Sequence, residues 1–271
     1  MISYMPRKGT KNNLDKKVKE IVNKQLANEI EEKHAITEYF NVAIKKAIPS
    51  GVVLNGQGNF FKILPQIEQS TTGEAGRAYN TRIGNEINLK ELDVTMAVNY
   101  AFSNTAQTTY EDAKIACRIM ILRAKEISDA ETLFDNMPTD TLIRFGNQAA
   151  GSANGVASFG GFELDAFRAL NRDTFSVKYD KVVYLDAPVL VPGTSGGQDL
   201  SVVPSRNKIL RHKLKFGKNG LKLKYSAQSD VDANNFPYFM CVGYSSMSSG
   251  SQPADNLVRM TVSAVSTYTD A

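Results

Sequence analysis

The sequence has 271 residues, of which 42 % are apolar, and it carries a formal net charge of +4. This length and composition suit one large β domain or two small domains. No apolar run approaches the roughly 20 residues of a membrane-spanning helix, so we expect neither a membrane span nor a signal peptide. The two histidines and two cysteines argue against a zinc site, and we expect no cofactor.

The two cysteines, Cys117 and Cys241, each lie within an apolar run typical of a buried strand. A free cysteine behaves as a small hydrophobic residue. We therefore predict two buried free thiols without a disulfide, which fits a reducing compartment.

The positive charge is concentrated in two segments. Residues 1–24 contain seven Lys or Arg and two acidic residues, and residues 200–229 contain eight Lys or Arg and no acidic residue. The remainder of the chain is therefore acidic. This asymmetry indicates a polyanionic partner.

The first basic segment divides into an arm and a helix. Residues 1–13 combine Pro, Gly and basic residues with little to bury, which predicts a mobile arm. Residues 14–31 carry apolar residues at helical spacing, at Leu14, Val18, Ile21, Val22, Leu26 and Ile30. This predicts an amphipathic helix that is only marginally stable alone, because it is short and its apolar stripe is narrow. We divide the chain into a basic N-terminal arm, residues 1–32, and a body, residues 33–271.

The body is organised around residues 81–102, whose second half alternates between apolar and polar side chains. The apolar set is Leu92, Val94, Met96, Val98, Tyr100 and Phe102. Successive side chains of a strand point to opposite faces, so this pattern predicts one long strand with one buried face. Such a strand needs a second sheet to lie against.

Seven further segments have strand patterns, at 34–46, 113–125, 174–187, 208–216, 221–226, 236–244 and 257–268. No helices alternate with them in βαβ order, which argues against a parallel sheet. The nearly continuous apolar run at 113–125 is typical of a strand covered on both faces. We predict an all-β fold, an eight-stranded antiparallel jelly roll built as a two-sheet sandwich, with a closed barrel as the alternative.

Three long loops, residues 49–80, 126–173 and 189–205, are candidates for contacts between copies. Within them we predict a turn of helix at 59–67, irregular structure at 151–161 and a short helix at 162–170. The Asn-Gly pair in Gly217-Lys218-Asn219-Gly220 predicts a tight turn that joins two strands.

The two strands beside that turn carry most of the second basic segment. Alternation places Arg211, Lys213 and Lys215 on one face of the first strand, and Lys222 and Lys224 on one face of the second. Two adjacent strands would present these five cations on one sheet face, and phosphate backbones are bound by such charges without sequence reading. A solvated sheet face is the alternative interpretation.

The order of these segments resembles a known group of proteins. A basic arm leads into the first strand and is followed by LPQIEQ, RIGNEINLKELDV, RIMILRAK, FSVKYDKVVYLD and HKLKFGKNGLKLKY. This arrangement resembles capsid proteins of small viruses with circular single-stranded DNA genomes that encode a replication initiator, with the circovirus-like family as the nearest comparison. The resemblance covers roughly residues 5–268 and is most specific at Arg82-Ile83-Gly84-Asn85 and in Tyr179–Asp186.

The resemblance implies a structural protein without enzymatic activity that self-assembles into a small icosahedral shell of T=1 size. The implied partners are further copies of the chain, circular single-stranded viral DNA and a host receptor of unknown identity. The implied locations are the virion and, during assembly, the host nucleus. The cations implied to face DNA are Arg7, Lys8, Lys11, Lys16, Lys17 and Lys19 of the arm, with Arg211, Lys213, Lys215, Lys222 and Lys224 of the body. The arm is less densely basic than is usual in that family, since Asp15 and Glu20 interrupt it.

Two other function classes fit parts of the sequence. Jelly rolls also serve as carbohydrate- or receptor-binding modules. The segment Gly193–Gly197 resembles the GDSGG loop of chymotrypsin-like serine proteases, and His34, Asp93 and Ser195 follow the chain order of that triad. A Ser/Gly loop is the simpler interpretation, because Thr194 stands where those proteases have Asp. The pair Asp230 and Asp232 lacks the spacing of a closed calcium site and is typical of a solvated turn.

Overall fold

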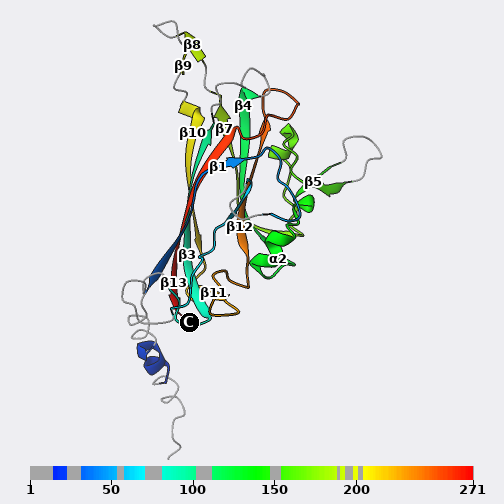
Figure 1. The fold of residues 1–271 in the computed structure, drawn as a ribbon. Coiled ribbons are helices and arrows are strands. Elements are labelled where there is room, and N and C mark those ends of the chain that lie inside the picture. The colour runs from blue at the N-terminus through cyan, green and yellow to red at the C-terminus, as the bar shows by residue number, and fades with distance from the viewer. Residues whose placement is uncertain are drawn as a thin grey trace, which may run out of the picture.

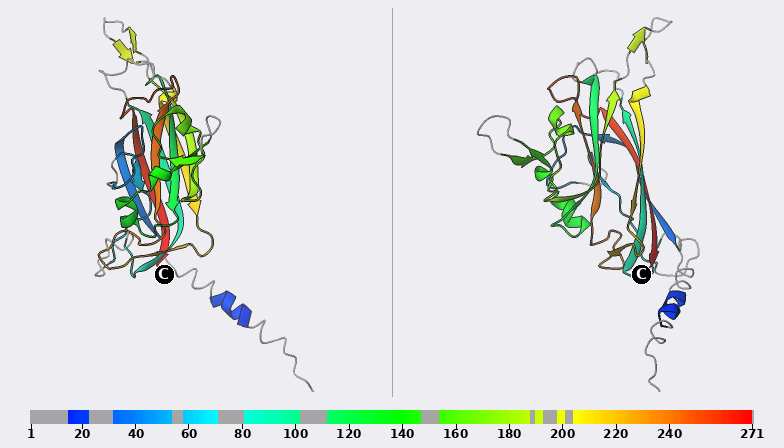
Figure 2. Two further views of the ribbon diagram at one scale, coloured as in Figure 1. Left: turned by 90° about the vertical axis from the view of Figure 1, so that its right-hand side faces the viewer. Right: turned by 180° about the vertical axis from the view of Figure 1, so that it is seen from behind.

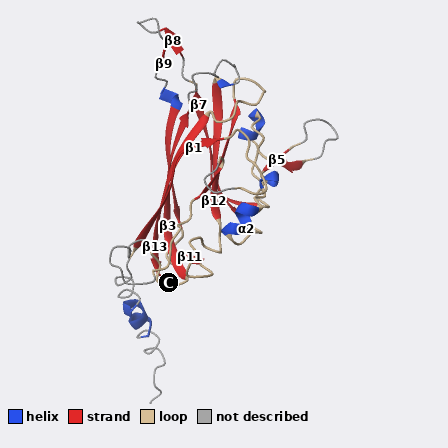
Figure 3. Ribbon diagram, viewed as in Figure 1, coloured by secondary structure: helices blue, strands red, loops and turns tan. Residues whose placement is uncertain are grey.

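The computed structural model describes residues 15–22, 32–53, 58–70, 81–101, 112–146, 154–187, 190–192, 198–200 and 204–270. Two antiparallel sheets face each other in these ranges and enclose a hydrophobic core (Figure 1). Strands dominate the body, and helices are confined to short segments (Figure 3). This confirms the predicted all-β, two-sheet sandwich.

The first sheet has five strands, in the order β1 (Lys33–Ile44), β13 (Val258–Asp270), β3 (Glu86–Tyr100) and β10 (Asn207–Lys215), with β11 (Leu221–Lys224) also paired to β3. The second sheet has four, in the order β2 (Phe60–Lys62), β12 (Tyr238–Ser246), β4 (Lys114–Ala124) and β7 (Phe175–Asp186). Strands that are successive in the chain mostly alternate between the sheets. This is the double Greek-key connectivity of a jelly roll.

Strand β3 lies in the middle of the first sheet and supplies much of the core. Leu92, Val94, Met96, Val98 and Tyr100 are fully buried, as the alternation predicts. The polar residues between them are partly exposed on the outer face. The predicted facing is therefore correct over residues 92–100, while Phe102 lies outside the described residues.

The long connection between β4 and β7 folds back over the outer face of the second sheet (Figure 2). It contains α2 (Ala130–Asp135), η3 (Thr139–Thr141), β5 (Ile143–Phe145), β6 (Gly155–Ala157) and η4 (Glu163–Ala166). We call residues 126–173 the excursion. Its apolar residues form a second core with Met120, Leu122 and Phe239, so β4 is covered on both faces, as its sequence predicts.

Several local predictions are wrong. Residues 60–62 form strand β2 rather than a turn of helix, because Phe61 and Lys62 pair with β12. By contrast, the short helix predicted within 162–170 is present, as the four-residue 3-10 helix η4. The segment 151–161, predicted to be irregular, contains β6, which pairs with β5. The loop at 188–204 contains the hairpin of β8 (Leu190–Pro192) and β9 (Gln198–Leu200), and η5 (Pro204–Arg206) follows.

The turn at 217–220 does not close a hairpin. Strands β10 and β11 follow one another along the same edge of β3. Gly217 and Gly220 both have positive φ, which only glycine adopts without strain. The chain therefore continues in the same direction along the edge of β3 instead of reversing. The prediction of eight strands counted β10 and β11 as two separate strands and did not include β2.

The arm is described only at residues 15–22, which are helical and fully on the surface. The remainder of the predicted helix at 14–31 lies outside the described residues. No helix in the described part of the chain is long and apolar enough to cross a membrane. The division at residue 32 stays a prediction.

Replacing Val98 by Asp is expected to abolish soluble folding, because Val98 is fully buried between the sheets and an unpaired charge there has no compensating partner. Replacing the adjacent Asn99 by Asp is the matched control, since Asn99 faces outward on the same strand. We expect the control to remain soluble with a melting temperature within a few degrees of the parent. The check is soluble yield and thermal unfolding, and equal behaviour of the two variants would contradict the facing.

The two thiols are expected to be unreactive in the folded protein. Cys117 packs in the core between the sheets, whereas Cys241 packs against the excursion, so they point to opposite faces of the second sheet. Burial raises the pKa of Cys117 to about 12 and also raises that of Cys241. A thiol reagent should label neither residue in the native state and two per chain after unfolding without reductant. One or no thiol after unfolding would contradict this.

Candidate nucleic-acid interface

The five predicted body cations do share one face. Along β10 and β11 the residues Arg211, Lys213, Lys215, Lys222 and Lys224 are exposed. The residues between them turn toward the core, where His212 packs on Tyr179 at 4.5 Å between ring centroids. Burial lowers the pKa of His212. We call the outer surface of β3, β10 and β11 the cationic face.

Acidic residues of β3 lie between these cations. Lys213 is 2.5 Å from Glu91 and 3.8 Å from Asp93, and Lys222 is 2.5 Å from Glu86. Glu86 also lies 3.7 Å from Lys224. The ion pairs raise the pKa of Lys213 and lower that of Glu86. The face is therefore mixed in charge, although residues 200–229 themselves contain no acid.

Arg211 and Lys215 differ from the other three cations. Neither forms an ion pair with any described residue. Arg211 stands opposite Thr95 in the register with β3. Lys215 lines a shallow depression together with His34, Lys90 and Glu91. These two side chains are the cations of the face that can contact a phosphate without giving up an existing partner.

The arm cations lie apart from this face. Lys16, Lys17 and Lys19 are exposed on the helix at 15–22, beyond the end of the first sheet at which β1 begins (Figure 1). Arg7, Lys8 and Lys11 lie outside the described residues. The structure thus does not bring the three described arm cations to the cationic face.

Two buried arginines each connect several chain segments through hydrogen bonds. The distribution of charge along the sequence does not reveal this role. Arg82 is fully buried and stacks on Tyr225 at 4.3 Å from the ring centroid. Its guanidinium donates to the carbonyl oxygens of Ile67, Gly84 and Ala227, among others. The motif at residues 82–85 therefore joins three chain segments at one end of the sandwich. These contacts give the motif a structural role.

Arg118 holds the excursion to the second sheet. It makes a bidentate pair with Asp180, at 2.8 and 2.7 Å, and its Nη1 donates to the carbonyl oxygens of Asp165 and Arg168. The buried carboxylate of Asp165 accepts from the backbone N–H groups of Gly160 and Phe162 and from the side chain of Arg168. The loop around η4 is thus held by charged hydrogen bonds, which are stronger than neutral ones.

The residues of the suggested protease triad have other contacts. His34 Nδ1 lies 3.2 Å from Thr267 Oγ1 on the neighbouring strand β13. Asp93 lies on β3, with the side chain of Lys213 nearby. Strand β13 separates β1 from β3, and Ser195 lies outside the described residues. The two described members therefore do not form the hydrogen-bonded base and acid that a triad requires.

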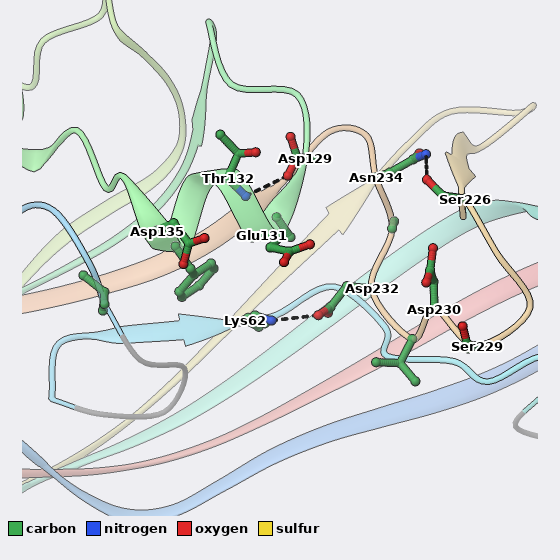
Figure 4. Close-up of a pocket in the computed structure, with 15 residues that line it drawn as sticks. Lys62, Asp129, Glu131, Thr132, Asp135, Ser226, Ser229, Asp230, Asp232 and Asn234 are labelled. Carbon is green, nitrogen blue, oxygen red and sulfur yellow. Dashed lines mark hydrogen bonds and ion pairs between the residues drawn. The ribbon is translucent and has the colours of Figure 1, made fainter.

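A cavity between α2 and the loop before β12 is lined by several carboxylates (Figure 4). Asp232 pairs with Lys62 at 2.7 Å, and Asp230 accepts from the backbone N–H of Ala227. Asp230 thus stabilises its own turn, and Asp232 connects that turn to β2. No group of three His, Cys, Asp or Glu side chains in the described ranges is arranged to hold a metal ion.

Replacing both Arg211 and Lys215 by Gln is expected to weaken binding to single-stranded oligonucleotides more than replacing Lys213 and Lys222. Each phosphate contact by a cation changes the slope of log affinity against log salt by about 0.7 for single strands. The first pair should therefore reduce the slope by about 1.4. The second pair should reduce it by less, since Glu91 and Glu86 already neutralise those lysines. Salt titrations of unassembled subunits provide the check, and equal reductions would contradict the distinction.

Comparisons with known proteins give weak similarities of shape only. No family model and no curated protein matches the sequence. Among solved structures, PNGF-II matches with a TM-score of 0.35 and 10 % identity, over 86 % of this chain and 34 % of its own. A KBV activated particle matches with a TM-score of 0.32 and 9 % identity, over 88 % and 69 %. A 60-mer of BFDV capsid protein matches with a TM-score of 0.15 and 11 % identity, over 89 % and 92 %. This chain thus spans about a third of PNGF-II, and similarity at this level does not define its family.

Proposed function

We propose that the chain is a viral capsid protein that self-assembles into a small icosahedral shell, of T=1 size, and packages circular single-stranded DNA. The observation that carries the proposal is a jelly roll whose first sheet has an exposed cationic face and continues at β1 into a basic arm. Jelly rolls build many capsids. Because the fold alone does not define a function, the charge distribution and the motif order resembling circovirus-like capsid proteins supply the remaining support.

The cationic face and the arm act on DNA without reading its sequence. Arg211 and Lys215 contact phosphates directly, and the paired lysines add to the local positive field. The arm cations Arg7, Lys8, Lys11, Lys16, Lys17 and Lys19 contact the same DNA. Residues 6–17 double as the signal for entry into the host nucleus, where the shell assembles. No catalytic step is required of any residue.

Assembly needs exposed surfaces that fit other copies, and the excursion offers one. Phe162, Leu164 and Phe167 project from the loop around η4, each more than half exposed. Exposed apolar clusters of this kind mark interaction surfaces. The network of Arg118 and Asp165 fixes the backbone that carries them, so little conformational entropy is lost when a partner binds.

Purification followed by size exclusion, with absorbance read at 260 and 280 nm, tests the proposal. We expect material far larger than 29.8 kDa that contains nucleic acid and appears as closed particles under the electron microscope. Nuclease digestion with DNase or RNase then identifies the cargo. A monomer that binds no nucleic acid would contradict the proposal, and glycan binding by such a monomer would instead assign a carbohydrate- or receptor-binding module.

Replacing Phe162 and Phe167 together by Ser is expected to block or weaken assembly while the subunit stays folded. Both side chains are exposed, so their loss costs little core packing. Ile83→Ser is the matched control, because Ile83 is also an exposed apolar residue but lies outside the three loops that are candidates for contacts between copies. The measurement is the particle fraction by size exclusion, with circular dichroism and thermal unfolding to establish the fold. Normal particle yield from the double variant would remove this surface from the assembly contacts.

A further inference from the structure

The outer face of the first sheet carries large apolar side chains that are exposed among the described residues. Phe40, Ile209 and Ile36 are 86 %, 72 % and 62 % exposed. They stand on β1 and β10, the two edge strands, with Ala97 and Val265 on the strands between them. We call Ile36, Phe40, Ala97, Ile209 and Val265 the outer apolar patch. A solvated sheet face is normally polar, so exposed apolar residues here indicate that another segment or molecule packs on the patch.

The strand register places these residues in two rows on one face, with Glu38 and Arg211 in the row between them. Ile209 stands opposite Ala97, which stands opposite Thr261 on β13. Phe40 lies beside Thr261, because the backbone N–H of the next residue, Asn41, donates to Thr261 Oγ1. Neighbouring strands are about 4.8 Å apart, so the row from Phe40 to Ile209 crosses the sheet in about 14 Å. A single α-helix of about 10 Å diameter can cover most of it.

The chain contains a second uncovered apolar surface, on the helix at 15–22, here called the arm helix. Val18, Ile21 and Val22 are about half exposed and share one helical face by their spacing. A helix of two turns is unstable alone in water and depends on packing of its apolar face. Packing on an apolar surface would therefore stabilise the arm helix, and the outer apolar patch is such a surface.

One charge on the sheet is complementary to the arm helix. The arm helix carries Lys16, Lys17 and Lys19 against two acids. On the sheet, Glu38 stands between Ile36 and Phe40 on the outer face of β1. Its carboxylate accepts from Ser263 and forms no ion pair with any described residue. An incoming lysine of the arm helix supplies the missing counter-charge.

The covalent connection allows the contact. Ten residues, 23–32, join the arm helix to β1, and a chain of that length can span about 33 Å. Phe40 lies seven residues along β1 from Lys33, a distance of about 23 Å. The arm helix lies beyond the end of the first sheet at which β1 begins (Figure 1). The patch is thus within reach of the arm of its own chain.

We propose that the arm helix folds back and packs Val18, Ile21 and Val22 on the outer apolar patch of its own chain. The lysines of the arm helix then lie beside Arg211 and Lys213, so arm and body cations form one surface. The inference rests on the two apolar surfaces and their charges, and does not depend on the proposed function.

Disulfide trapping tests the contact directly. The natural thiols are both buried, so introduced cysteines are the reactive ones. The test protein carries Ile21→Cys and Ile209→Cys, and the control carries Ile21→Cys and Val156→Cys, with the second site on the excursion. Formation of the disulfide releases two electrons and two protons from the introduced thiols, and these reduce one oxidised glutathione to two molecules of reduced glutathione. High salt and low protein concentration keep the subunits apart.

We expect an intrachain disulfide in the test protein, seen as a faster band on a non-reducing gel and a mass lower by two hydrogens. The control should react at least about tenfold more slowly, as expected for a site that the docked helix does not reach. Cross-linking only between chains would overturn the proposal in favour of a helix supplied by a neighbouring copy. Equal rates in the two proteins, or no cross-link, would also overturn it.

Hydrogen exchange gives an independent measurement without introduced cysteines. In the unmodified chain the amides of residues 15–22 should be protected, and Phe40→Ser with Ile209→Ser should accelerate their exchange by about tenfold. Both positions are exposed, so the body should keep its own protection pattern. Val52→Ser is the control and should leave the arm helix protected. Unprotected amides in the unmodified chain would contradict the docking.

Discussion

The structure depends on strand β3, which is hydrogen-bonded along both edges and carries its whole apolar face into the core. Its inward residues, from Ile87 to Tyr100, are inaccessible to solvent, and β13, β10 and β11 pair with it. Burying a large apolar side chain contributes about 1.5–3 kcal/mol, so seven such positions contribute about 10–20 kcal/mol, as much as the net stability of an ordinary domain or more. A strand of this kind is stable only against a second sheet, which makes the sandwich a consequence of β3.

Two buried arginines then fix the positions of loops relative to the two sheets. Arg82 gathers three segments at one end, and Arg118 fixes the excursion through Asp180 and two carbonyl oxygens. Removing one partner of a buried charged pair typically costs about 3–5 kcal/mol. Such networks allow long connections to present fixed surfaces, and the apolar residues around η4 are held outward in this way. In the proposed function, packaging and assembly use different parts of the chain, the first sheet and the excursion.

The outer face of the first sheet combines interactions that sequence segments show only separately. Cations from β10 and β11 meet acids from β3, and apolar side chains from the two edge strands flank them. Only Arg211 and Lys215, of the five cations, have no ion pair among the described residues. A face of this kind suits both a polyanion and an amphipathic helix, because each uses a different set of its side chains.

The sequence by itself determined the periodic features of this protein. Alternation along residues 92–100 and 209–215 predicted which side chains are buried, because the two faces of a strand depend only on residue parity. The all-β class, the doubly covered strand β4 and the buried thiols followed from equally local patterns. Tertiary structure alone decided what depends on pairing across the chain. Phe60–Lys62 became a strand because β12 lies beside it, and β10 and β11 became one interrupted edge because both pair with β3. The acids that form ion pairs with Lys213 and Lys222 come from a strand more than 100 residues away in the chain. Register and long-range contacts have no local signature in a single sequence, so only the folded chain reveals them.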